Sequence, residues 1–199
     1  MIAARLDVLP KEERSVLNDA AVIGKVFWRG VLGGLGTGGD ALDASLDSLE
    51  SRDVIRAEPV SKVEGDREYA FRHILIRDVA YGTLTRGARR ERHQAVAAYF
   101  EDTIPDRDSI AAILAYHWKE AGDAARAVGH LLTAAEQAEL GWANAEAVGL
   151  YEEALSLIPA EELGRRRSIG LRRSVAWSRY EHSVTDEASL RRAARADEG

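Results

Sequence analysis

The chain has 199 residues, of which 46 % are hydrophobic, and a formal net charge of -6 at pH 7. This length allows one large or two small domains with an apolar core, and the negative charge disfavours a general nucleic-acid binder, which needs a basic surface. The absence of cysteine excludes disulfides, thiolate zinc sites and cysteine nucleophiles. No apolar run approaches the roughly 18 residues of a membrane span and no signal peptide follows Met1, so we expect a cytoplasmic protein without membrane association.

The first 84 residues predict three helices followed by a β-hairpin. Pro10 is placed at the start of the first helix and Gly24 at its end. The second helix is expected over residues 27–35, the third over 40–53, and the two strands over 54–58 and 68–71, with a turn near Gly65. This order of elements is the layout of a winged-helix domain, which we place at residues 1–84.

A glycine-rich segment, Gly33-Gly-Leu-Gly-Thr-Gly-Gly39, follows the second predicted helix. A Walker loop ends in Gly-Lys-Ser/Thr at the start of a helix, and a dinucleotide-binding loop follows a strand. Here Asp40 and Ala41 follow the last glycine, and a helix precedes the segment. We therefore interpret residues 33–39 as a flexible connection and not as a nucleotide site.

The third helix would be the recognition helix of a DNA-binding winged-helix domain, and its charge disfavours that role. A recognition helix offers Arg, Lys, Asn or Gln to bases and phosphates. Residues 40–53 carry instead a net charge of about -4, which phosphates repel. The charged side chains are Asp40, Asp43, Asp47, Glu50 and Asp53, against Arg52 alone. We expect a structural or switching domain without direct DNA binding.

The stretch from Tyr69 to His93 joins the first module to the rest of the chain. It begins with the second strand, in which aromatic residues alternate, and it turns into a helix near His73. On this helix an apolar stripe at helical spacing predicts the buried face, whereas Arg77 and Asp78 fall outside it. The stripe consists of Leu75, Ile76, Val79, Ala80 and Leu84.

A basic helix is expected next, over residues 85–104, and we interpret it as the connection between two modules. Its core-facing stripe recurs at spacings of three and four, and Pro105 ends it. Its arginines are better explained by a solvated face or a domain contact than by a nucleic-acid patch, because the rest of the chain is acidic. The stripe is His93, Val96, Ala97, Phe100 and Ile104; the arginines are Arg86, Arg89, Arg90 and Arg92.

Residues 105–199 predict a series of paired helices over 109–121, 124–140, 143–158 and 161 to about 182, with a polar, fraying tail from Arg191. Small and aromatic residues repeat between two of them: Ala127, Leu131 and Ala134 are matched by Ala147, Tyr151 and Ala154. The second set is similar to the second helix of a tetratricopeptide repeat, although the two sets are about 20 residues apart instead of about 34. We expect an irregular, truncated helical array that offers a concave surface to partners.

No constellation for catalysis or metal binding is evident. The histidines, His73, His93, His117, His130 and His182, show no His-x-x-x-His spacing and no metal motif, and no Gly-x-Ser-x-Gly elbow occurs. His93 and His117 lie on apolar stripes, where a hydrogen-bonded core histidine is the commoner outcome. We expect no enzymatic activity and no metal site in this chain.

Several segments together resemble the region that follows the ATPase core of STAND-type ATPases, which are large bacterial signalling proteins. The family includes regulators with a LuxR-type DNA-binding end and proteins with an adenylate or guanylate cyclase domain. The resemblance implies a winged helix followed by tetratricopeptide-like helices. It rests on residues 2–10, on Leu17 to Phe27 with Ala20 and Gly24, on Tyr69-x-Phe71-x-His73-x-Leu75-Ile-Arg-Asp78-Val-Ala-Tyr81, and on Arg89 with His93.

The family's nucleotide-binding segments and effector ends are absent, so the chain is expected to be an internal fragment or a truncated product. ATP or ADP is implied for the parent protein only, and this chain should hold no cofactor. The resemblance predicts a non-catalytic sensor portion that relays inducer or partner binding on the repeats to a nucleotide domain elsewhere. The alternative is a free-standing adaptor that binds proteins through its helices, and a DNA-binding winged-helix regulator is the least favoured interpretation.

The resemblance also gives His73 a role. The run His73-Ile-Leu-Ile-Arg-Asp78 is similar to the Met-His-Asp motif region of STAND winged helices, in which the histidine contacts the bound diphosphate and holds the closed state. An imidazole at a helix start can donate to a phosphate oxygen. Arg72 occupies the methionine position and Ile74 the aspartate position, so an orienting partner is missing. The alternative is that His73 caps the hairpin–helix corner through hydrogen bonds.

Overall fold

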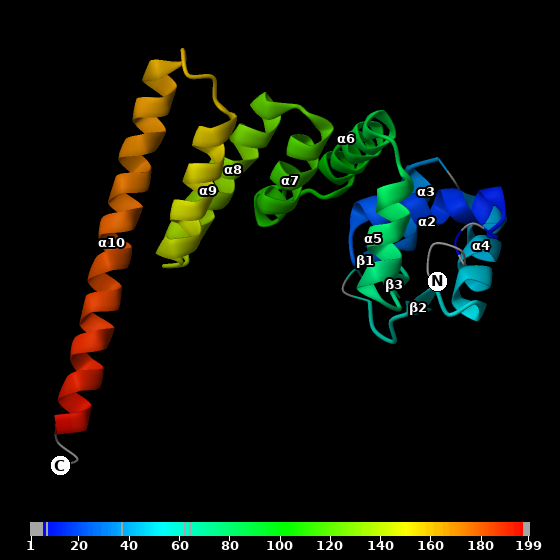
Figure 1. Ribbon diagram of the computed structural model, residues 1–199, viewed down its shortest axis with the longest axis horizontal. Helices are drawn as coiled ribbons and strands as arrows, with labels where there is room; N and C mark the ends of the chain where they lie inside the picture. The colour runs from blue at the N-terminus through cyan, green and yellow to red at the C-terminus, as the bar shows by residue number, and fades with distance from the viewer. Residues whose placement is uncertain (1–5, 7, 37, 62, 64, 197–199) are drawn as a thin grey trace. The chain divides into compact units, whose positions relative to one another are not determined.

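The computed structural model describes residues 6, 8–36, 38–61, 63 and 65–196, with side chains as far as residue 185. The chain divides into two compact units, Met1–Pro105 with Glu120–Gly122 (unit 1) and Asp106–Lys119 with Asp123–Gly199 (unit 2). The predicted mainly helical class with a small β-structure is confirmed, since unit 1 adds one three-stranded antiparallel sheet to its helices (Figure 1). Within the described part of the chain, no helix combines the length and apolarity needed to cross a membrane.

Unit 1 begins with helix α2, which follows Pro10 and ends at Gly24. Pro10 is the N-cap and not the first helical residue: its carbonyl accepts the Arg14 N–H at 2.9 Å. Thr85 caps the last helix of the unit by accepting the Ala88 N–H through its hydroxyl oxygen at 3.2 Å. The elements are α2 (Lys11–Ile23), β1 (Val26–Trp28), α3 (Arg29–Gly34), α4 (Gly39–Ser51), β2 (Ile55–Ala57), β3 (Glu68–Phe71), α5 (Ile74–Thr83) and α6 (Arg86–Thr103).

The helix predicted over residues 27–35 is wrong in its first part, where the structure has strand β1. This strand pairs antiparallel with β3 and places Phe27 opposite Tyr69, so the order of the sheet is β1-β3-β2. The Phe27 ring is fully buried, 5.9 Å from the Tyr69 centroid and 5.4 Å from that of Phe71. Burial of three aromatic rings in one cluster outweighs the local preference for helix.

Helix α6 belongs to unit 1 by its contacts, because it packs on α2 and α3. Its predicted core stripe is confirmed at His93, Val96, Ala97 and Phe100, which are buried. The domain boundaries predicted at residues 84 and 104 stay predictions. The main core of the unit lies between α2, α4, α5 and the sheet. Fully buried members of that core include Leu17, Leu32, Leu42, Leu46, Leu49 and Ile55.

Gly34, at the end of α3, touches the ring of Tyr99 on α6, and a Cβ added there would overlap that ring. Gly33→Ala is a matched control, since its added Cβ would meet only Leu42 Cδ2 at 4.0 Å. We expect Gly34→Ala to lower the free energy of unfolding by about 1–3 kcal/mol, as overpacking does. Gly33→Ala should change it by less than about 0.5 kcal/mol. Urea denaturation measures both values, and equal stabilities would contradict this packing.

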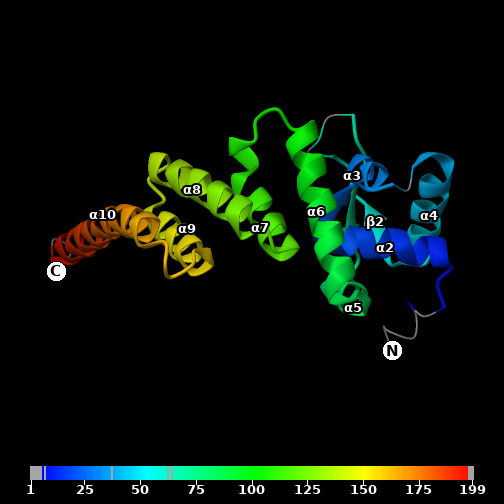
Figure 2. The ribbon, with the colours of Figure 1, turned by 90° about the horizontal axis from the view of Figure 1, so that it is seen from above.

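Unit 2 contains the elements η1 (Asp108–Ile110), α7 (Ala111–Ala121), α8 (Ala124–Leu140), α9 (Asn144–Leu157) and α10 (Leu163–Ala196). The last two residues of α7, Glu120 and Ala121, group with unit 1. The turns between its helices are short, and α8 and α9 lie side by side (Figures 1 and 2). Both predicted sets of small and aromatic residues are buried, and Ala147, Tyr151 and Ala154 are fully enclosed. Small residues at these positions allow the two helices to approach closely.

The last helix is longer than predicted. It continues past His182 as far as Ala196, so the helix end near residue 182 is wrong. The physical reason is composition: residues 171–196 contain neither proline nor glycine and are rich in Ala and Arg, which favour helix. Fraying from Arg191 stays a prediction. The remainder of the predicted tail, residues 197–199, lies outside the described residues.

Candidate functional site

His73 lies at the corner where β3 ends and α5 begins. It is the N-cap residue, with an extended backbone, and its side chain is exposed and forms no cap hydrogen bond. The expected cap is made by the backbone instead, because the His73 carbonyl accepts the Ile76 N–H at 3.0 Å. The capping alternative is therefore wrong for the imidazole, which is left pointing at solvent from the start of a helix.

Two aliphatic residues next to His73 are also exposed. The exposed fractions are 47 % for Ile74 and 58 % for Leu75, so Leu75 does not belong to the buried stripe that the spacing predicted. The buried side of α5 is formed by Ile76 and Ala80, and Arg77 fixes the helix on α2 by donating to the Ala21 carbonyl at 2.9 Å. We call His73, Ile74 and Leu75 the corner patch.

The electrostatics of the corner patch favour an anion or a hydrogen-bond acceptor. The first turn of α5 contains no acidic residue, so no carboxylate of that turn compensates the helix dipole or the N–H groups of Ile74 and Leu75. Arg72, in the position before His73, is held by Asp53 at 2.9 Å. The patch can thus make contacts through one imidazole and two aliphatic side chains, but it encloses no substrate.

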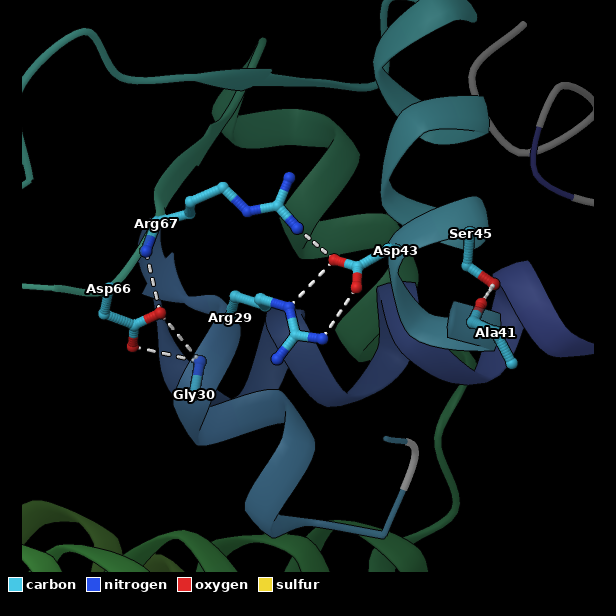
Figure 3. Close-up of polar contacts among 7 residues, drawn as sticks. All are labelled: Arg29, Gly30, Ala41, Asp43, Ser45, Asp66 and Arg67. Carbon is cyan, nitrogen blue, oxygen red and sulfur yellow. Dashed lines mark hydrogen bonds and ion pairs between the residues drawn. The ribbon is translucent and has the colours of Figure 1, made fainter. Parts of the chain in front are cut away.

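Two of the four acidic residues of α4, Asp43 and Glu50, are engaged within unit 1. Asp43 accepts hydrogen bonds from Arg29 at 2.8 and 2.7 Å and also pairs with Arg67 (Figure 3). The Arg29 hydrogen bond holds the pKa of Asp43 below its ordinary value. Glu50 accepts the Ala57 N–H at 2.7 Å. The charge counted over residues 40–53 alone therefore overstates how acidic this surface is, and the absence of DNA binding stays a prediction.

Asp66, in the turn of the hairpin, ties the hairpin to α3. Both of its carboxylate oxygens accept the Gly30 N–H, at 3.1 and 3.0 Å (Figure 3). A Cβ at Gly30 would lie 2.6 Å from one of these oxygens, so a larger residue would displace the carboxylate from this position. The sequence indicated a turn here, but it contained no signal for the partner 36 residues away.

Three of the four arginines of α6 make intramolecular contacts. Arg92 Nε donates to Asp19 at 2.7 Å, Arg89 Nε to the Tyr81 carbonyl at 3.1 Å, and Arg90 Nε to the Ala121 carbonyl at 3.1 Å. These bonds agree with the interpretation of the basic segment as a contact face. They also use guanidinium groups that a nucleic-acid patch would need free.

His93 is a buried core histidine, as predicted from its stripe. Its Nε2 lies 3.0 Å from the Tyr81 hydroxyl, and Arg77 and Arg89 lie over the Tyr81 ring. Burial, helped by the charges of Arg77 and Arg89, lowers the pKa of His93 to about 4. The imidazole is therefore neutral at pH 7 and serves the packing of α5 on α6. His117 is buried as well.

The loop in the glycine-rich segment, residues 33–39, is shorter than predicted. Gly33 and Gly34 belong to α3 and Gly39 to α4, and Thr37 lies outside the described residues. Among the described residues no cluster of His, Cys, Asp or Glu has the arrangement of a metal site. The segment at residues 2–5 and 7, which contributes to the resemblance, also lies outside the described residues.

Comparison with protein-family models, with curated proteins and with solved structures finds no match for this chain. Its function is therefore inferred from its own residues. The corner patch is the exposed feature of unit 1 in which a predicted binding residue, exposed apolar side chains and an uncompensated helix start coincide.

Proposed function

We propose that the chain is a non-catalytic regulatory portion of a STAND-like ATPase signalling protein. Unit 2 binds an inducer or a partner protein, and unit 1 relays that event to a nucleotide-binding domain outside this chain. The interpretation of unit 1 as a winged helix is supported by its order of helices and strands and by the hairpin beside β1. The interpretation of unit 2 as tetratricopeptide-like is supported by the matched buried residues of α8 and α9.

One observation carries this proposal: the corner patch is exposed at the position to which the resemblance assigns contact with the bound nucleotide. A side chain that served only the fold would be hydrogen-bonded or packed there, whereas His73 is exposed without a cap hydrogen bond, beside two exposed aliphatic residues. Exposed apolar residues next to a polar anchor are typical of a binding surface.

The proposal predicts that the full chain, used as bait, captures a protein with a Walker-type ATPase domain. The double variant Ile74→Asp/Leu75→Asp should lose that protein, because two carboxylates would have to be buried in the contact. Val60→Asp is the matched control, since Val60 is 79 % exposed and belongs to the hairpin connection instead of the patch. Quantitative mass spectrometry of the captured proteins provides the measurement. Capture of unrelated proteins, equally by all three baits, would contradict the proposal and favour the adaptor alternative.

A further inference from the structure

Over residues 163–185, helix α10 contributes two apolar side chains to the buried core of unit 2. Between residues 163 and 185 its buried side chains are Ile169 and Ala176. Helices α8 and α9 each bury five residues over shorter lengths. The apolar contact that normally fixes a helix in an array is therefore weak for α10.

Arginines take the place of apolar residues along the contact. The side of α10 that lies on α9 follows the three-and-four spacing of a helix seam: Arg166, Ile169, Arg173, Ala176 and Tyr180. Arg166 Nη1 donates to the carbonyls of Leu155 and Ile158 at 2.6 and 2.7 Å, at the end of α9. These carbonyls have no partner within their own helix, so an arginine is well suited to them.

Three further arginines of α10 pair with glutamates of the helices beneath it. Arg172 pairs with Glu136, Arg173 with Glu152 at 2.8 Å, and Arg179 with Glu139 at 2.8 Å. The arginine side chains are 41–52 % exposed, so water and salt screen these pairs. The attachment of α10 is specific in geometry but weak and sensitive to salt.

The face beneath α10 has an apolar centre with an acidic rim. Tyr151 is fully buried at its base and donates to Glu139 Oε1 at 2.6 Å, which fixes that carboxylate. A depression of about 450 Å³ lies beside Tyr151 and Glu139. Its lining residues are Glu136, Glu139, Leu140, Tyr151, Arg172 and Arg179. A face of this kind is complementary to any amphipathic helix that presents arginines on both sides of a small apolar seam.

We propose that the acid-rimmed face of α8 and α9 is a binding surface for an arginine-bearing amphipathic helix of a partner protein, and that α10 is its displaceable internal occupant. The partner helix replaces the arginines of α10 on Glu136, Glu139 and Glu152 and covers Tyr151 in their place. This inference goes beyond the proposed function, and its test needs neither a nucleotide nor another protein.

The test uses a fluorescein-labelled peptide of residues 163–185 as the partner helix and the full chain as the receptor, with fluorescence anisotropy as the readout. In the wild-type chain α10 competes at high effective concentration. The variant Arg172→Glu/Arg179→Glu weakens that competition, so it should bind the peptide at least about tenfold more tightly than the wild type does. The affinity should fall with added sodium chloride. A peptide with the same two substitutions should not bind the variant.

Two controls separate displacement from general electrostatic attraction. Arg165→Glu makes the same arginine-to-glutamate change at one position of α10, but Arg165 pairs with Glu162, just before α10, and not with α8 or α9, so this variant should bind the peptide as weakly as the wild type does. The second control, Glu136→Arg/Arg172→Glu, exchanges the two charges of one ion pair, so α10 still pairs with α8. Its affinity for the peptide should equal that of the wild type. Equal peptide affinities for the wild type and Arg172→Glu/Arg179→Glu, or tight binding by either control, would overturn the proposal.

Discussion

Replacing Arg92 with methionine should lower the free energy of unfolding by about 2–4 kcal/mol, because it leaves a buried carboxylate without its counter-ion. Asp19 is 8 % exposed and accepts a hydrogen bond from Arg92 Nε at 2.7 Å, which joins α2 to α6. Burial raises the pKa of Asp19, and the hydrogen bond and charge of Arg92 oppose that rise. Without the guanidinium, the cost of desolvation is no longer offset.

The pH dependence of the Arg92→Met effect has a definite sign. A carboxyl group whose folded-state pKa is raised destabilises the fold above that pKa, and the penalty disappears as pH falls toward the unfolded value of 3.8. The loss measured by urea denaturation should therefore be smaller at pH 4 than at pH 7. The double variant Asp19→Asn/Arg92→Met should recover most of the lost stability at pH 7. If Arg92→Met were as stable as Asp19→Asn/Arg92→Met, the unpaired Asp19 carboxylate would not lower the free energy of unfolding, which would contradict the prediction.

Acid should destabilise unit 1 through His93 by about 3 kcal/mol between pH 6.5 and 4, because the pKa of this histidine falls from 6.5 to about 4 on folding. In that interval the unfolded chain binds the proton that the folded chain excludes. Stability should therefore rise with pH across this window and become independent of His93 above pH 6.5. The cause is burial of the ring beneath Tyr81, with Arg77 and Arg89 nearby.

His93→Gln isolates this contribution, because glutamine is polar but does not titrate in this range. Urea denaturation at pH 7 and pH 4.5 should show a loss of about 2.5 kcal/mol in the wild type that is missing from His93→Gln, after the shared change from other groups is subtracted. The matched control His182→Gln changes an exposed histidine of α10 and should retain the full loss. An equal loss in wild type and His93→Gln would contradict the burial of a neutral imidazole.

The parts of the fold that were predictable depend on local patterns. The alternation of aromatic residues over residues 68–71 indicated a strand, and the spacing of His93, Val96, Ala97 and Phe100 indicated the buried side of α6; both are confirmed. Strand β1 was missed because three apolar residues beside a helix are compatible with either state. Its pairing with β3, some 40 residues later, decides between them.

The buried face of α5 could likewise not be predicted from the run Ile74-Leu75-Ile76 alone. Three adjacent apolar residues allow two different stripes on a helix, and only the packing of α5 against α2 selects Ile76 over Leu75. The length of α10, by contrast, was available from the sequence, since nothing in residues 171–196 breaks a helix.

The candidate site was predictable in position but not in its contacts. The corner at His73 follows from a strand pattern that meets a helix pattern, and the structure places His73 there. The ion pairs that hold the unit together join residues far apart in the chain, such as Arg92 with Asp19 and Arg67 with Asp43. Such pairs could not be derived from one sequence, because each arginine has many acidic residues available.

The central claim, that this chain regulates a nucleotide domain through His73, is tested most directly by the rate at which fluorescent ADP leaves an ATPase domain captured by the chain. The chain alone should bind no ADP. In the complex, His73→Ala should speed ADP release by roughly tenfold or more, the effect of losing one hydrogen bond to a charged group. His182→Ala, which alters an exposed histidine of unit 2, should leave the rate unchanged. Identical release rates for wild type and His73→Ala, with both complexes intact, would contradict the claim.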